Sequence, residues 1–288
     1  MGHLSELKGV EKPVTEWLSK MGWEFKSNEE LKTYKRAFSN PIIEQILIEK
    51  TAEINKTNED VAKSAVDLLL KNLSNPTPIL GNEAFLDKLH TGITLSVRGD
   101  DIDIRFINFE NIWENSFIVT NQYWVQGFKM VKTDVVLLVN GIPLVPIEAK
   151  QRARKGTNWM EGVRQFSTYS QRAEKLFMCH AFGVACNGRI TKYGIPGASS
   201  SYFNEWKNTL LDVYHHNPIL EPKNDLCKTY QDEKDGLWNF DVDRMPNGEV
   251  LERMKLGIIG LLQPARVLDI LQHFIVFITT PISSSNIQ

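Results

Sequence analysis

The segment KTDVVLLVNGIPLVPIEAK carries two acids and a lysine whose types and spacing could do chemistry: Asp134, then Glu148, then Lys150 two positions later. Mg²⁺ binds oxygen ligands and keeps several waters, so one or two carboxylates can hold it. Such an ion polarises a phosphate and generates a hydroxide, and a nearby ammonium stabilises the developing negative charge. These residues therefore indicate metal-dependent phosphodiester cleavage. Taken alone, a surface salt bridge between Lys150 and either acid is an equal alternative.

Two adjoining strands must position these groups. Residues two apart on a strand face the same side, so Glu148 and Lys150 share a face, while Val145, Ile147 and Ala149 lie on the other. The apolar face is predicted to be the core, and the face of Glu148 and Lys150 is predicted to open into a cleft.

The turn between the strands decides whether the acids can meet. Asn140-Gly141 is a strong hairpin signal, but a regular two-residue turn would place Asp134 on the opposite side from Glu148. We therefore expect one extra residue in the ladder. A three-residue loop with Gly141 in the left-handed conformation would supply it, and the prolines of IPLVPIEAK, which lack an N–H, also indicate a bulge or bend.

Residues after the hairpin fit a nucleic-acid cleft. Arg152, Arg154 and Lys155 form a basic run where a phosphate backbone would pass, although such runs are more often solvated loops. Gln165 and Tyr169 lie one turn apart on the next predicted helix, where they could brace Lys150 or contact DNA.

The composition predicts an ordinary globular protein. The chain has 288 residues, 42% hydrophobic and 24% charged, with a formal net charge of -2, so any positive surface for nucleic acid must be local. Three cysteines without a C-x-x-C motif predict buried, reduced thiols. No secretory signal opens the sequence, and its most apolar stretch is interrupted by polar residues, so we expect a soluble, cytoplasmic protein.

The order of elements predicts an α/β sheet with helices packed on it. Helices are expected at 10–21, 41–55 (with Pro41 in its first turn), 58–73 (capped by Asn58), 83–92 and 157–177. Strands are expected at 93–97, 101–109, 117–125, 134–139, 142–150, 176–186 and 189–194. Two further helices are expected within 248–278.

The same residues carry a resemblance to a known family. Asp134, the segment VNGIPLVPIEAK and the Gln–Tyr pair of RQFSTY resemble the N-terminal endonuclease domain of the R (HsdR) subunit of type I restriction–modification enzymes, in the PD-(D/E)XK superfamily. EKPVTEWLSKMGW and LQPARVLDILQHFIVF support the resemblance, which covers about residues 5–278. Thr133 stands where that motif has proline. No G-x-x-x-x-G-K-[ST] loop is present, so ATP would belong to a helicase motor outside these residues.

The resemblance implies a restriction-endonuclease-like mixed central sheet flanked by helices, with a C-terminal helical extension. It implies a nuclease core at 1–195, a loop-rich and helical extension toward the motor at 196–278, and a disordered tail at 279–288. It also implies roles for individual residues: Mg²⁺ (or Mn²⁺) ligands Asp134, Glu148 and the Ala149 carbonyl, the catalytic lysine Lys150, and the accessory pair Gln165 and Tyr169. Glu11 is a further candidate ligand, with a surface acid as the more frequent alternative.

The resulting hypothesis is an endonuclease domain that cleaves duplex DNA without reading sequence at the cut, in a complex with methyltransferase (M) and specificity (S) subunits. A stand-alone repair or junction nuclease is one alternative, and it would need its own DNA-binding surface. A non-cutting assembly module is another. The intact Asp134, Glu148 and Lys150 set disfavours the module.

Overall fold

The computed structural model describes residues 10–150, 159–206 and 250–277. At its centre is a mixed six-stranded sheet in which β1 and β7 run parallel to their neighbours β4 and β6, and the remaining pairs are antiparallel. In spatial order the strands are β1 (Glu24–Phe25), β4 (Phe117–Gln126), β5 (Met130–Val139), β6 (Ile142–Ala149), β7 (Gly183–Cys186) and β8 (Thr191–Gly194).

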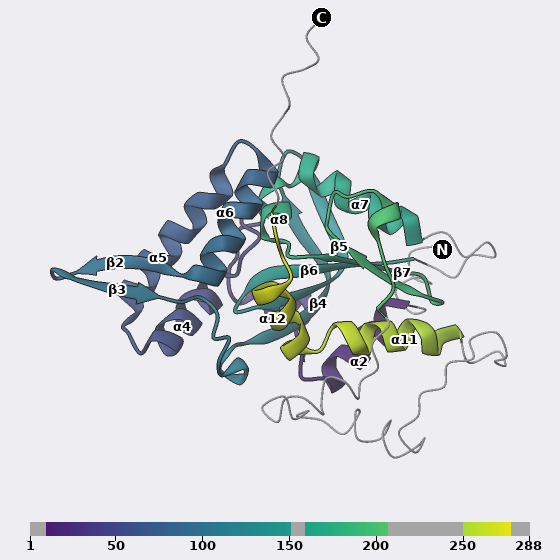
Figure 1. Ribbon diagram of the computed structural model, residues 1–288, viewed down its shortest axis with the longest axis horizontal. Coiled ribbons are helices and arrows are strands. Elements are labelled where there is room, and N and C mark those ends of the chain that lie inside the picture. Colours follow the sequence, from purple (N-terminus) through teal and green to yellow (C-terminus); the bar gives the residue numbers. More distant parts are fainter. Residues whose placement is uncertain (1–9, 151–158, 207–249, 278–288) are drawn as a thin grey trace, which may run out of the picture.

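Helices cover both faces of this sheet (Figure 1). One face packs against α7 (Trp159–Arg172), and the other against α2 (Lys12–Lys20), α11 (Val250–Leu261) and α12 (Pro264–His273). The short α8 (Glu174–Cys179) contributes buried residues to the hydrophobic clusters on both faces. The short α3 (Asn28–Lys32) contacts β4. Beyond one end of the sheet lie α4 (Glu44–Asn55), α5 (Glu59–Lys71), α6 (Pro78–Thr91) and a separate hairpin of β2 (Ile93–Val97) and β3 (Asp100–Ile104). Three short 3₁₀ helices, η2 (Asn72–Ser74), η3 (Ile112–Glu114) and η4 (Ser200–Tyr202), complete the described elements.

The α/β architecture expected from the sequence is confirmed at this level, and several local signals act as expected. The side chain of Asn58 accepts from the Val61 N–H and caps α5. The helix expected from Pro41 begins only at Glu44, because the chain around Pro41 serves another contact: its carbonyl accepts the buried Tyr123 hydroxyl at 2.7 Å.

The expected strand at 176–186 is wrong in its first half. Residues Glu174–Cys179 form α8, and only Gly183–Cys186 forms β7. All of Leu176, Phe177, Met178 and Cys179 are buried, so the run is apolar without period. An apolar run of this length does not distinguish a buried strand from a buried helix, which is why the pattern misled.

The C-terminal helices share the core of the sheet. Ile258, Leu262 and Leu268 are fully or almost fully buried in the cluster that also contains Val135. The indole N–H of Trp23 donates to the Leu262 carbonyl at 2.7 Å. The C-terminal helices from Met254 to Leu271 therefore contribute to the same hydrophobic core as the strands.

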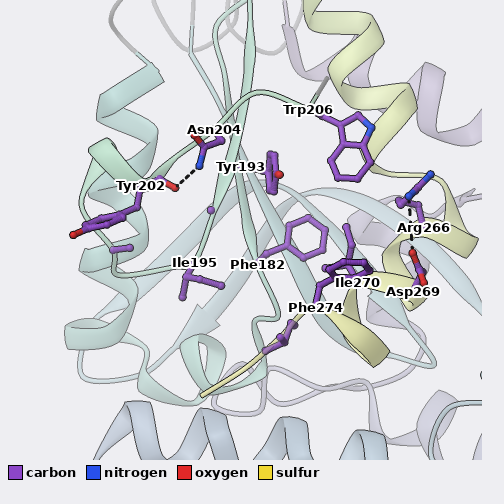
Figure 2. A pocket seen from close by; sticks show the side chains of 13 residues that line it. Phe182, Tyr193, Ile195, Tyr202, Asn204, Trp206, Arg266, Asp269, Ile270 and Phe274 are labelled. Carbon is purple, nitrogen blue, oxygen red and sulfur yellow. Dashed lines mark hydrogen bonds and ion pairs between the residues drawn. The ribbon is translucent and has the colours of Figure 1, made fainter. Parts of the chain in front are cut away.

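A cavity of about 640 Å³ lies between β8 and α12, with mainly apolar walls (Figure 2). Phe182, Tyr193 and Trp206 line it from the sheet side, and Ile270 and Phe274 from α12 and the residue after it.

Cys179 and Cys186 are buried free thiols, as expected for reduced cysteines, whereas Cys227 lies outside the described residues. Within the described ranges no helix has the length and hydropathy that crossing a membrane requires.

Candidate active site

The β5–β6 hairpin is held at its turn by buried hydrogen bonds. Asn140 and Gly141 both have positive φ (50° and 80°), as a two-residue hairpin turn requires. The fully buried Asn140 side chain donates to the Phe106 carbonyl and accepts from the Ser116 N–H, at 2.8 and 2.7 Å. The Gly141 carbonyl accepts from the Ile43 N–H at 3.0 Å. These bonds fix the hairpin against the neighbouring loops.

The extra residue predicted for this ladder is present, although in a different place. Val139 pairs with Ile142 across a two-residue turn, so the three-residue loop is wrong. The register then shifts between Leu137 and Leu138, where Leu144 is the residue without a partner. This bulge pairs Val135 with Ile147 and thereby brings the following positions, Asp134 and Glu148, opposite each other.

The two strands separate at the acids. Val135–Ile147 is the last pair of the ladder, and beyond it the Asp134 carboxylate accepts the Ala149 N–H at 2.9 Å. A side-chain oxygen therefore takes the position that a strand carbonyl would have in a continued ladder. Asp134 is consequently held by the backbone of β6, next to Glu148.

Lys150 joins the two carboxylates. Its Nζ lies 3.1 Å from Asp134 Oδ2 and 3.4 Å from Glu148 Oε2. The backbone N–H of Lys150 donates to the Cys186 carbonyl at 2.8 Å, which connects the end of β6 to β7. The side chains of Asp134 and Lys150 are each 13% exposed, so solvent reaches the cluster from their side. The structure thus brings together the three residues singled out from the sequence.

The face expected to open into a cleft is instead covered by α7. Glu148 is fully buried, and the Tyr169 hydroxyl donates a short hydrogen bond to its Oε1. Close approach is possible because Gly162 has no side chain; a Cβ there would lie 2.9 Å from the Cβ of Glu148. Gly162 was not identified from the sequence, although a glycine on the buried side of an amphipathic helix is the signal that could have found it.

The buried charges change the proton affinities of the cluster. Burial, and then the charge of Asp134, raise the pKa of Glu148 well above its usual value. Burial and the charge of Glu148 raise the pKa of Tyr169, so it remains a hydroxyl donor. Burial alone would lower the pKa of Lys150, but the charges of Glu148 and Asp134 outweigh it and the net pKa is raised. Lys150 is therefore an ammonium at neutral pH.

Two polar groups near the cluster lack partners. Gln165 lies one turn before Tyr169 on α7, and its buried Oε1 accepts no hydrogen bond. His180, whose ring lies 6.1 Å from that of Tyr169, has both nitrogens buried without a partner. Burial lowers its pKa to about 3, so it is neutral. A buried acceptor without a hydrogen bond destabilises the folded state unless water or a ligand donates to it. Gln165 is therefore a candidate to accept a hydrogen bond from water or a ligand.

Glu11 does not lie on the surface, and the surface-acid alternative is wrong. It is 1% exposed and accepts from the side chain of Gln122 at 2.8 Å. Gln122 lies on β4 with φ of 54°, next to the pairs that join β4 to β5. Glu11 is thus connected to the strand that carries Asp134 through Gln122. Arg152, Arg154 and Lys155, the expected DNA contacts, lie outside the described residues.

The donor set suits a small oxygen-seeking cation. Among the described residues no three His, Cys, Asp or Glu side chains gather closely enough to hold a metal ion. Mg²⁺ needs only one or two carboxylates, however, and Asp134 and Glu148 already converge on one cation, the ammonium of Lys150. With the orphaned Gln165 oxygen nearby on α7, the residues present fit a hydrated divalent ion.

The large cavity of Figure 2 is separate from this cluster. In the sheet Glu148 pairs with Ala185, and Ala185 with Lys192, whereas the cavity starts at Tyr193 and Gly194. None of the clustered acids, nor Lys150 or Tyr169, lines it.

Comparison with known proteins identifies related sequences. A family model described as "Type I restriction enzyme R protein N terminus" matches residues 3–200. The type I restriction enzyme HindI endonuclease subunit of Haemophilus influenzae is 24% identical over 280 residues, which are 93% of this chain and 24% of that protein. A putative type I restriction enzyme MjaVIIIP endonuclease subunit of Methanocaldococcus jannaschii is 30% identical over 182 residues, 61% of this chain and 17% of that protein.

Further similarity is found in Staphylococcus aureus, whose type I restriction enzyme SauCOLORF180P endonuclease subunit is 34% identical over 103 residues, 34% of this chain and 11% of that protein. The chain therefore spans about a quarter or less of the length of these relatives.

Proposed function

The chain belongs to the family of type I restriction enzyme R protein N termini, and from that premise we propose that it is the endonuclease domain of a type I restriction enzyme, hydrolysing phosphodiesters of duplex DNA in the presence of Mg²⁺. The fold proposed for it is the restriction-endonuclease-like PD-(D/E)XK fold. The mixed sheet, with its parallel connection from β6 through α7 and α8 to β7, supports this assignment.

One observation carries the proposal: oxygens of Asp134 and Glu148 both lie within 3.4 Å of the Lys150 ammonium. Burying three ionisable groups together is costly, and replacing such groups by apolar residues is often neutral or stabilising. A cluster that a stable fold does not need, at an edge reached by solvent, indicates chemistry. This also favours a cutting domain over a non-cutting assembly module.

Asp134, Glu148 and the Ala149 carbonyl would hold the Mg²⁺ ion in this proposal, and Mn²⁺ could substitute. When bound, the ion polarises the scissile phosphate and lowers the pKa of a coordinated water. The chain prepares both acids for this task. The Ala149 N–H orients the Asp134 carboxylate, and the Tyr169 hydroxyl orients that of Glu148.

Lys150 would act as a charge stabiliser. The nearby charges of Glu148 and Asp134 raise its pKa, which favours the ammonium form. Its short distance to both acids places its charge where a phosphate oxygen would approach, so it can stabilise the negative charge that develops there. Gln165, with its unpaired oxygen, would accept a hydrogen bond from a water or from Lys150.

The remainder of a type I enzyme would supply what this chain does not contain. Recognition of the DNA site is assigned to the S subunit, modification to the M subunit, and ATP-driven motion to a motor in the longer R subunit. The family membership favours this reading over a stand-alone repair or junction nuclease.

The test is cleavage of plasmid DNA by the complete R subunit containing this region, assembled with its M and S subunits, ATP and Mg²⁺. We expect Lys150→Ala to abolish cutting while ATP hydrolysis continues at the parent rate, since the motor is separate. Lys71→Ala, on the exposed side of α5, is the matched control and should cut normally. Unchanged cutting by Lys150→Ala would contradict the proposal.

A further inference from the structure

The β4–β5 hairpin next to the carboxylates has an unusual surface. At its tip Phe128 is 85% exposed, and Trp124 and Met130 are each 42% exposed. Single exposed apolar residues are common, but three on one short hairpin form a patch that packing does not explain. Such a patch indicates an interaction surface.

Cationic residues lie next to these side chains. Residues 122–133 contain Lys129 and Lys132 and no acid. The Lys132 ammonium lies 5.6 Å from the centre of the Trp124 ring. The Lys129 N–H donates to the Arg172 carbonyl at 3.1 Å, which brings the end of α7 and another exposed cation beside the tip. In a chain with a net charge of -2, this is the kind of local positive surface that a nucleic acid would require.

The surface is continuous with the candidate active site. Lys132 and Asp134 lie on the same strand, two residues apart, and the Lys132 carbonyl is 3.5 Å from the Tyr169 hydroxyl that contacts Glu148. At about 3.3 Å per residue, the part of β5 from Met130, next to the tip, to Asp134 extends roughly 13 Å. That length corresponds to about four base pairs of a duplex, which rises 3.4 Å per step.

We propose that the β4–β5 hairpin binds duplex DNA alongside the cleavage point, with Lys129, Lys132 and Arg172 contacting phosphates and Phe128 packing against a groove. The proposal rests on the proposed function, because it takes the DNA to be the one cut at Asp134 and Glu148. A duplex is favoured over an acidic protein because the cations follow the strand from the tip to the acids, as a phosphate backbone would. The hairpin would thus hold the substrate in register with the metal-binding acids.

The experiment measures binding of a fluorescent 20-base-pair duplex to the full 288-residue chain over a range of salt concentrations. Each phosphate contact contributes about 0.9 to the slope of log K against log salt, so Lys129→Gln with Lys132→Gln should lower the slope by about 2. Lys63→Gln with Lys71→Gln on α5 removes the same charge from exposed helix positions and should leave the slope unchanged. Phe128→Ser should weaken binding of the duplex without changing the slope. The same variant should bind heparin, a polyanion without a groove, as tightly as the parent.

Equal slopes for the two double variants would overturn the proposal, as would a parent chain that shows no salt-dependent binding. If Phe128→Ser has no effect and the hairpin lysines matter equally for heparin and duplex, the surface is a general anion surface and the proposal fails. Its outcome is separable from that of the proposed function. If the hairpin lysines contribute to the salt slope but the assembled complex does not cut DNA, only the proposed nuclease activity is rejected. If the complex cuts DNA but the hairpin lysine variant has the slope of the parent, only the proposed DNA binding by the hairpin is rejected.

Discussion

Ile147 and Glu148 are neighbours on β6, and the two faces of the strand on which they lie are buried in opposite ways. Ile147 faces the large hydrophobic cluster shared with α2 and α11, where it is fully buried among apolar side chains. Glu148 is equally buried, but beneath α7, where its neighbours are Asp134, Lys150 and Tyr169. Burial of Ile147 therefore stabilises the folded state, whereas equal burial of Glu148 destabilises it.

The difference shows where the fold obtains its stability and where it places its chemistry. Removing apolar surface from water stabilises the folded state by roughly 25 cal/mol per Å². Removing a carboxylate from water destabilises it unless hydrogen bonds and opposite charges compensate. The apolar face can therefore support the polar one, and substitutions on the two faces should have different consequences.

The largest expected effect is on cleavage, from Glu148→Gln. This change keeps the shape of the side chain and its contact with Tyr169 but removes the charge proposed to hold Mg²⁺. We expect cleavage by the assembled enzyme to fall by about 10²–10³-fold, the scale for loss of a group that stabilises the transition state. Far-UV circular dichroism should remain that of the parent. Retention of more than a tenth of the activity would show that Glu148 is not essential.

The neighbouring substitution on the other face should affect stability and not chemistry. Ile147→Ala leaves a cavity in the hydrophobic cluster and should lower the free energy of unfolding by about 2–5 kcal/mol. Urea denaturation of the 288-residue chain measures this directly. Well below the melting temperature of the variant, cleavage per folded molecule should match the parent. A large loss of cleavage by folded protein would mean that the two faces are not functionally separate.

A smaller effect is expected from Tyr169→Phe, which removes the hydroxyl that donates to Glu148. A hydrogen bond to a charged group contributes about 1.5–3 kcal/mol, so cleavage should fall by roughly 10–100-fold. Since the tyrosine orients a ligand and does not bind the ion in this account, raising the Mg²⁺ concentration should restore part of the loss. Absence of any rescue would assign Tyr169 a role beyond positioning.

The smallest effect concerns pH and stability in the presence of a chelator. The pKa of Glu148 is raised in the folded chain, so above the unfolded value, near 4.5, the folded state holds a proton that the unfolded state has released. This contribution to stability is present at low pH and is lost as pH rises through the folded pKa. Glu148→Gln removes this titration, so the variant should gain stability relative to the parent by up to about 1.4 kcal/mol for each pH unit between the unfolded and the folded pKa, and should keep that gain at higher pH. Thermal melts from pH 4 to 8 would reveal the trend. A variant that loses stability relative to the parent as pH rises would contradict the raised pKa of Glu148 in the folded chain.

The contrast between the two faces also explains which features of the site could be predicted from the sequence. The identities and spacing of Asp134, Glu148 and Lys150 predicted the cluster, and strand alternation predicted that the ladder needs one more residue. The position of that residue, Leu144, depends on how the turn is held by Asn140 and its distant partners, which no local pattern contains.

The covering of Glu148 could not be predicted for the same reason. It depends on the close approach of α7 to β6, which Gly162 permits, and the alternation of side chains along β6 does not show that the following helix packs over the Glu148 face. Likewise, the second part of α8 resembles a buried strand in sequence because four successive residues, Leu176 to Cys179, are all buried. The β4–β5 hairpin could have been noticed, since its lysines and aromatic residues stand in a stretch without acids, but only the structure shows that Phe128 and Trp124 are exposed.

The most direct test of the central claim, that Asp134 and Glu148 share one divalent cation, is anomalous scattering from crystals of the 288-residue chain soaked in Mn²⁺. We expect one Mn²⁺ peak next to both carboxylates and loss of that peak in Glu148→Gln. Crystals in which both carboxylates are ordered and Mn²⁺ binds elsewhere, or not at all at millimolar concentration, would contradict it.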